Sequence, residues 1–116
     1  MAYISKKDDI KNHIYEMILK GSLKDNDPLF EKKYFTSKFK VNPSYVDKAL
    51  TELEREGYIY KDNDKYKLRV DEPTIMILKD RFLNTYVNDF LDSIDKIGVS
   101  IDEAIEILNL RNGANG

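Results

Sequence analysis

Apolar residues recur at helical spacing in several stretches of the chain, and turn-forming residues separate these stretches. The first stretch predicts a helix of about four turns that begins after a capping signal at Ser5 and stops at Gly21. Its apolar positions are Ile10, Ile14, Met17 and Ile18. A loop over residues 21–28 follows, and residues 31–39 predict a second, shorter helix whose buried side is formed by Tyr34, Phe35 and Phe39.

The third predicted helix, over residues 43–56, has the clearest pattern. Asn42 can cap it, because its side-chain oxygen accepts an amide of the first turn, and Pro43 suits the first helical position. Gly57 fits the left-handed residue that closes a helix. The apolar stripe predicted to face the core consists of Val46, Ala49, Leu50 and Leu53. An ordinary core helix would show the same stripe. The role of the third helix is therefore inferred from the segments on either side of it.

Those surroundings predict a helix-turn-helix followed by a wing. Residues 40–42 form the turn between the second and third helices. Residues 58–60 and 66–70 have the aromatic and β-branched content of strands, and residues 61–65 supply a tight turn between them. Residues 71–73, which include Pro73, are expected to act as a linker. This order places the third helix where a recognition helix enters the major groove of DNA.

The tail predicts two amphipathic helices, one from about Thr74 to Gly98 and one after a capping box at residues 100–103. Steps of three and four residues in the first helix form a heptad seam. We expect nine residues to form a dimer contact: Phe82, Leu83, Tyr86, Val87, Phe90, Ile94, Ile97, Ile105 and Leu108. Burying five or six such side chains at about 2 kcal/mol each is enough to hold a dimer. Folding back onto the preceding domain is the alternative.

The predicted fold is therefore mainly α with a small β-hairpin. A winged helix-turn-helix over residues 1–70 is followed by a two-helix C-terminal dimerisation tail over residues 74–111. One interpretation of Phe82, Tyr86 and Phe90 is a small apolar effector site; the other is a core, to which aromatics at helical spacing more often belong.

Composition excludes several classes of function. The chain has no cysteine, so it forms neither disulfides nor thiolate metal sites, and its one histidine, His13, has no second histidine beside it. It also lacks a phosphate-binding glycine loop and a nucleophile with a histidine partner, so we expect no enzyme, no cofactor and no metal. No apolar run is long enough for a membrane span or a signal peptide, which predicts a cytoplasmic protein.

Charge is unevenly distributed although the net charge is only −2. Residues 28–70 carry ten basic and seven acidic side chains, whereas residues 71–116 carry four basic and nine acidic ones. The basic excess therefore lies on the segment expected to meet DNA. A solvated surface of mixed charge would look similar.

Four segments resemble the GntR family of bacterial transcription regulators, and the short tail resembles its YtrA subfamily. They are Ile-Leu-Lys-Gly-Ser-Leu-Lys at 18–24, Val-Asn-Pro at 41–43, Leu-Glu-Arg-Glu-Gly-Tyr-Ile-Tyr at 53–60, and the tail at 83–108 with its Gly-Val-Ser break at 98–100. The resemblance covers nearly the whole chain. It implies a cytoplasmic homodimer that binds a palindromic operator, typically as a repressor of a transporter or stress operon.

The resemblance places a phosphate-contacting residue at Lys33, base-contacting residues at Ser44 and Tyr45, and a wing-tip residue at Lys65. Together with neighbouring polar positions, the full set expected at DNA is Lys32, Lys33, Lys40, Asn42, Ser44, Tyr45, Asp47, Lys48 and Lys65.

The chain also departs from the family pattern. Phe30 and Glu31 replace the usual Pro-Ser, Asp47 stands where many members have arginine, and the wing holds Asp62, Asn63, Asp64 and Tyr66 in place of glycines and arginines. A carboxylate at position 47 suits DNA only if it accepts from a cytosine amino group. These departures keep a second hypothesis open: a winged-helix module or co-regulator that binds protein and has weak or lost DNA binding.

Overall fold

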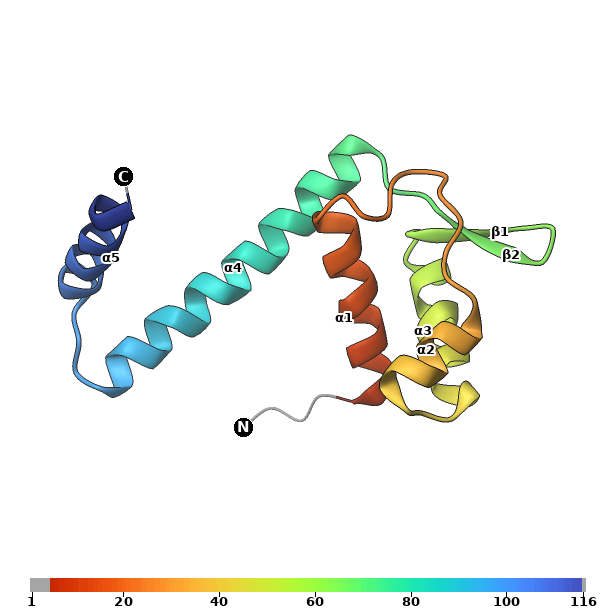
Figure 1. Cartoon of the computed structure of the whole chain (residues 1–116), viewed down its shortest axis with the longest axis horizontal. Helices are drawn as coiled ribbons and strands as arrows, with labels where there is room; N and C mark the ends of the chain where they lie inside the picture. The colour runs from red at the N-terminus through yellow and green to blue at the C-terminus, as the bar shows by residue number, and fades with distance from the viewer. Residues whose placement is uncertain (1–4, 116) are drawn as a thin grey trace. The chain divides into compact units, whose positions relative to one another are not determined.

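The structure, a computed structural model, describes residues 5–115 and divides into two units, Met1–Leu78 and Lys79–Gly116. Its elements in chain order are α1 (Lys6–Leu19), α2 (Lys32–Phe39), α3 (Pro43–Arg55), β1 (Ile59–Asp62), β2 (Lys65–Leu68), α4 (Glu72–Lys96) and α5 (Ile101–Asn115) (Figure 1). The first unit contains α1 to β2 and the first turns of α4; the second contains the remaining turns of α4 and α5. The prediction of a mainly helical fold with one β-hairpin is confirmed.

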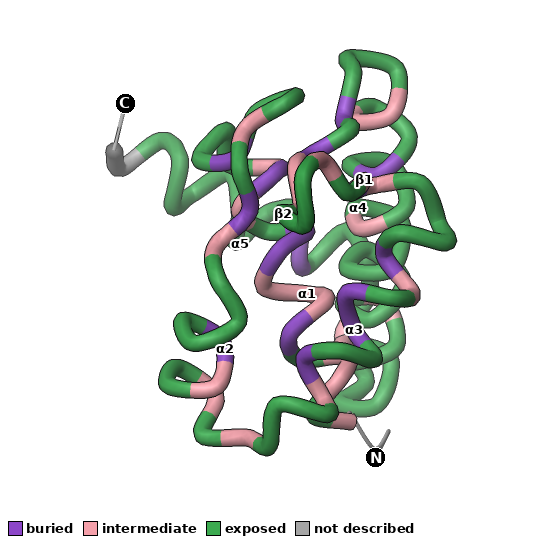
Figure 2. Tube along the Cα trace, turned by 90° about the vertical axis from the view of Figure 1, so that its right-hand side faces the viewer, coloured by how far each residue is buried: buried purple, intermediate pink, exposed green. Residues whose placement is uncertain are grey.

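The core of the first unit is built from one side of each helix and of the hairpin. Figure 2 shows buried segments recurring along α1 and α3, as the apolar spacing of both helices predicts. The largest fully buried side chains are Ile10, Ile14, Ile18, Phe35, Val46, Leu53, Ile59, Leu68, Val70 and Leu78. All four residues of the predicted α3 stripe are buried. The opposite side of α3 is therefore left for other contacts.

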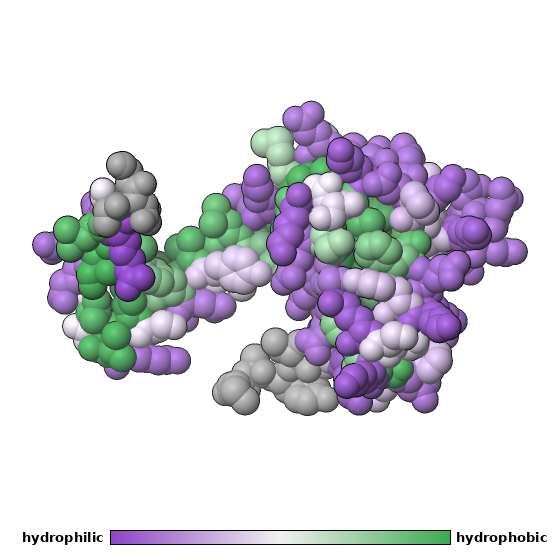
Figure 3. Space-filling view, viewed as in Figure 1, coloured by the Kyte–Doolittle hydropathy of each residue, from purple (hydrophilic) through white to green (hydrophobic). Residues whose placement is uncertain are grey.

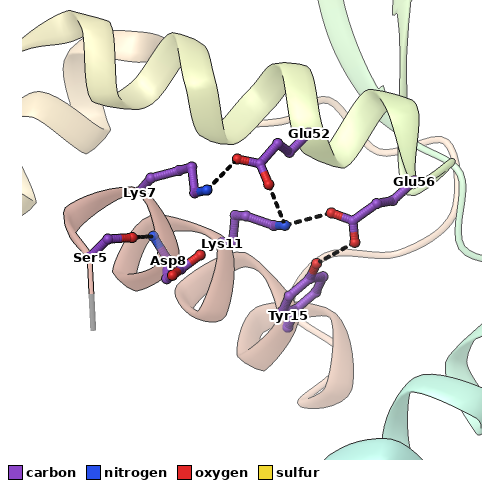
Figure 4. A network of polar contacts seen from close by, with 7 residues as sticks. All are labelled: Ser5, Lys7, Asp8, Lys11, Tyr15, Glu52 and Glu56. Atoms are coloured by element: carbon purple, nitrogen blue, oxygen red, sulfur yellow. Dashed lines mark hydrogen bonds and ion pairs between the residues drawn. The ribbon is translucent and has the colours of Figure 1, made fainter. Parts of the chain in front are cut away.

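Ion pairs between α1 and α3 hold the orientation of α3 (Figure 4). The Lys11 ammonium lies 2.5 Å from Glu56 Oε1 and 3.4 Å from Glu52, and Lys7 lies 2.6 Å from Glu52. The Tyr15 hydroxyl donates to Glu56 Oε2 at 3.2 Å. Burial acts to lower the pKa of Lys11, but the hydrogen bond to Glu56 and nearby negative charge outweigh it and raise that pKa. Lys11 therefore stays charged at neutral pH.

The buried side of α2 differs from the prediction. Phe35 is fully buried, but Tyr34 is exposed and Phe39 is half-buried. The Tyr34 hydroxyl lies 2.9 Å from His13 Nε2 on α1, and its ring contacts Phe30 with centroids 4.4 Å apart. Tyr34 therefore covers the edge of the core instead of entering it, because its hydroxyl needs a polar partner.

The wing is a two-stranded antiparallel hairpin in which Ile59 pairs with Leu68 and Asp62 with Lys65. Both residues of its turn, Asn63 and Asp64, have positive φ, as a two-residue type I′ turn requires. Because this turn uses only two residues, β1 runs to residue 62 and β2 starts at residue 65, closer to the tip than predicted.

Sequence reasoning missed a third segment that lies along the hairpin. The amide of Leu29 donates to the carbonyl of Tyr66 at 2.9 Å, and the amide of Leu68 donates to the carbonyl of Asp27 at 2.9 Å. The segment predicted as a loop therefore covers the outer edge of β2. Pro28 forms a β-bridge with Lys67. Because proline is typical of turns, the sequence at this point predicted a loop and not a paired segment.

Residues 71–73 do not form the predicted linker, because α4 begins at Glu72. Asp71 caps the helix: its Oδ1 accepts from the amide of Thr74 at 3.0 Å and from the Thr74 hydroxyl at 2.5 Å. Pro73 lies in the first turn, where its missing amide hydrogen costs no hydrogen bond. The predicted break at Gly98 is confirmed by its φ of +72°, and Ser100 caps α5 by accepting from the amide of Glu103.

Candidate nucleic-acid interface

The side of α3 opposite the core stripe is open to solvent. Ser44, Asp47, Lys48 and Thr51 are exposed, and Tyr45 is half-buried. Ser44, Asp47 and Thr51 follow one another at steps of three and four residues, so they line one face of the helix. This face can donate and accept hydrogen bonds along about two turns, which suits the edges of bases in a major groove.

The start of α3 is well ordered by its cap. Asn42 Oδ1 accepts from the amide of Ser44 at 3.1 Å, and Pro43 occupies the first position. A helix start carries partial positive charge and amides without helical partners, so it attracts anions such as phosphate.

Two lysines lie near the ring of Tyr45. The ammonium groups of Lys6 on α1 and Lys48 on α3 lie 5.4 Å and 5.8 Å from the centre of its ring. Both distances fall within the range of a cation–π contact. The ring therefore gathers positive charge at the start of α3, although its own partial burial leaves less of it available for a base edge than was expected.

Three lysines of the predicted set belong to α2 and the turn after it. Lys32 forms an ion pair with Asp47, with Nζ 2.6 Å from Oδ1. Lys33 and Lys40 are exposed and form no ion pair with any residue that the structure describes. Lys40 holds a left-handed conformation, with φ +53° and ψ +52°, at the end of α2. No described carboxylate forms an ion pair with either lysine, so an external anion can do so.

The acids of the wing are partly neutralised by its own lysines. Lys67 Nζ lies 2.8 Å from Asp62 Oδ2, and this hydrogen bond raises the pKa of Lys67. Lys65, the predicted tip residue, is exposed. The Tyr66 hydroxyl donates to Glu54 Oε1 of α3 at 3.4 Å, and burial together with the Glu54 carboxylate raises the pKa of Tyr66. The hairpin is thereby tied to α3.

A groove of about 550 Å³ separates the exposed face of α3 from the hairpin. One wall is the segment before α2, the second is α3 and the third is the hairpin. Its lining residues are Pro28, Leu29, Phe30, Glu31, Lys32, Asp47, Leu50, Thr51, Lys61, Asp64, Lys65 and Tyr66. The groove brings Lys32, Asp47 and Lys65 of the predicted set to one place.

In the second unit, contacts within the tail leave most of the predicted dimer residues open. Seven of the nine are exposed, from 42% for Phe90 to 74% for Ile97, and Phe82 and Ile94 are half-buried. Figure 3 shows apolar surface on α4 and α5. Ile101, which belongs to the apolar face predicted for α5, is also exposed, and so are Ile107 and Leu110, which lie outside that face.

Over residues 5–115, no group of three or more histidine, cysteine, aspartate or glutamate side chains is arranged to hold a metal ion. None of the described helices is long and apolar enough to cross a membrane.

Neither a protein-family model nor a curated protein matches the sequence of the chain. Solved structures do match its fold. A GntR family transcriptional regulator from Listeria monocytogenes has a TM-score of 0.79 at 23% identity, over 90% of this chain and 93% of that one. The fold is that of GntR-family regulators.

Two further structures share this GntR fold. A transcriptional regulator from Oenococcus oeni has a TM-score of 0.70 at 21% identity and covers 94% of both chains. YtrA from Sulfolobus acidocaldarius, a GntR-family transcription factor, has a TM-score of 0.55 at 25% identity, over 99% of this chain and 95% of that one. All three matches extend over both units. All three neighbours are transcription regulators.

Proposed function

We propose that the chain is a sequence-specific DNA-binding transcription regulator of the GntR family, in which α3 enters the major groove. One observation carries this proposal: the polar face of α3 is exposed beside a capped helix start and two lysines, Lys33 and Lys40, that form no ion pair within residues 5–115. Ser44, Asp47 and Lys48 then face base edges, while the lysines and the amides at the start of α3 fix the phosphates.

We further propose that the regulator acts as a homodimer held by the tail. A second copy gives the exposed apolar residues of α4 and α5 a partner, and the heptad seam of α4 suits lengthwise helix packing. A two-fold axis would present two α3 helices to half-sites about one helical turn apart, which predicts a palindromic operator. The short tail supports placement near YtrA, which has a similar fold.

A dimer that occupies an operator blocks access to a promoter, so repression is the simplest outcome, and a transporter or stress operon is the proposed target. This role places the protein in the cytoplasm with the chromosome. Any small-molecule effector would act by favouring one arrangement of the dimer.

The test is selection of duplexes from a randomised library, followed by fluorescence anisotropy on the selected duplex at several salt concentrations. Each phosphate neutralised adds about 0.9 to the log–log slope of affinity against salt. Lys33→Ala should lower affinity for every duplex and reduce that slope by about one.

Lys24→Ala is the matched control, since Lys24 is an exposed lysine in the loop after α1, outside the proposed interface. The proposal fails if the wild-type protein selects no sequence, and the role of Lys33 fails if Lys33→Ala and Lys24→Ala behave alike.

Some of the acidic residues that favour a protein-binding module form ion pairs with lysines. Asp47 is paired with Lys32 and Asp62 with Lys67, so two of the carboxylates near the proposed DNA surface are already neutralised. Co-purification with a second regulator, without any selected duplex, is the result that would favour the alternative.

A further inference from the structure

The ion pair between Lys32 and Asp47 joins the first residue of α2 to the exposed face of α3. The Lys32 ammonium lies 2.6 Å from Asp47 Oδ1, and the two side chains are 48% and 57% exposed. Exposed ion pairs of this kind contribute little to the free energy of folding. The main physical effect of the pair is therefore on the charge presented by α3.

A lone carboxylate on a recognition helix is repelled by the phosphates on both sides of the groove. Lys32 cancels that charge at the surface of α3 and does so without occupying the whole carboxylate. A carboxylate has two oxygens and about four lone pairs, so Asp47 keeps acceptor capacity while it holds the ammonium. The pair can therefore approach DNA as a neutral acceptor.

The ionised Asp47 carboxylate accepts hydrogen bonds and donates none, so it distinguishes among the bases. In the major groove, cytosine presents an amino donor, whereas guanine and thymine present acceptors at the equivalent edge. Adenine presents an amino donor beside the N7 acceptor, which opposes a carboxylate but suits an asparagine amide. Asp47 lies at the middle of the line formed by Ser44, Asp47 and Thr51, where a helix in the groove meets base edges.

We propose that Lys32 and Asp47 act as one base-reading unit: Lys32 neutralises Asp47, and Asp47 accepts a hydrogen bond from the amino group of cytosine at one position of each half-site. This inference rests on the proposed DNA-binding function and adds the base that is read and the residue that makes the reading possible. Lys32 is a positioning and neutralising residue, and Asp47 is the specificity-determining one.

The experiment selects duplexes from a randomised library with the wild-type protein and with Asp47→Asn. Affinities are then measured for four versions of the selected duplex that differ only at the position assigned to Asp47. The wild type should prefer cytosine there by about five- to a hundredfold. Asp47→Asn should move the preference at that position to adenine and leave the other positions unchanged.

Lys32 is tested in both backgrounds. Lys32→Met alone should weaken binding to the cytosine duplex at least about fivefold, because it leaves an unpaired carboxylate against the phosphates. In the Asp47→Asn background the same change should cost less, since no carboxylate remains to be neutralised. Lys38→Met is the matched control, because Lys38 is an exposed lysine in the last turn of the same helix.

The possible failures are distinguishable. Specific, salt-dependent binding with an unchanged base preference in Asp47→Asn overturns this inference and leaves the proposed function standing. Equal losses for Lys32→Met in both backgrounds overturn the neutralising role of Lys32. A wild-type protein that selects no duplex overturns the proposed function and this inference together.

Discussion

The lysines around α3 differ in whether they form ion pairs with carboxylates in the described part of the chain. Lys11 and Lys7 are held by Glu52 and Glu56 and serve the packing of α1 on α3. Lys33 and Lys40 form no ion pair within the described part of the chain. At the residue scale, the second group is therefore the one that an external anion can use.

Two substitutions of Lys40 should have the same effect on DNA binding but different effects on stability. Its φ of +53° is unfavourable for a residue with a Cβ, and glycine relieves about 1 kcal/mol of that cost. Lys40→Gly should therefore raise the free energy of unfolding, measured by urea denaturation, while it lowers DNA affinity on all sequences. Lys40→Ala should lower affinity equally without the gain in stability. Unchanged affinity in both variants would remove Lys40 from the interface.

At the element scale, the local signals of the sequence predicted most of the fold. The cap at Asn42 and the stop at Gly57 define α3, because both act on backbone groups within a few residues. The pairing of residues 26–29 with β2 and the exposure of Tyr34 were not predictable in this way. They depend on contacts with segments distant in sequence, and Pro28 gives a misleading local signal.

The candidate site was predictable only in part for the same reason. Spacing alone identified the exposed face of α3, because the buried stripe defines its opposite. The pairing of Lys32 with Asp47 depends on how α2 packs beside α3, and no local pattern carries that information. The role of the tail residues stays a prediction that rests on their exposure.

A charge placed in the seam of α4 tests the proposed dimer contact. Val87 lies in the seam of α4 and is 45% exposed, so a charge there should not disturb folding of the chain but should oppose helix pairing. Light scattering after size exclusion should give a dimer for the wild type and a monomer for Val87→Glu. Asn88→Glu, which adds the same charge at the neighbouring exposed residue, should remain dimeric. A monomeric wild type would favour the intramolecular alternative for the seam.

At the scale of the whole molecule, His13 should make the free energy of unfolding depend on pH. Burial against α2, and to a smaller extent the positive charge of Lys38, lower the pKa of His13 below its usual 6.5. The folded state therefore favours the neutral ring, and protonation favours the unfolded state. Stability should be complete above pH 6.5 and should fall as the pH drops below it.

The measurement is the free energy of unfolding between pH 7.5 and pH 5.5, where carboxylates with ordinary pKa values contribute little. His13→Gln should flatten the fall over this range. An equally steep fall in His13→Gln would mean that another group causes it.

The proposed DNA-binding surface is the exposed face of α3. It is tested most directly by titrating the isotopically labelled protein with a selected duplex and following each backbone amide by NMR. We expect the largest shifts on residues 42–48, with smaller ones at Lys33 and the tip of the hairpin and little change in α5. Shifts confined to the tail helices, or no shifts at any duplex concentration, would contradict it.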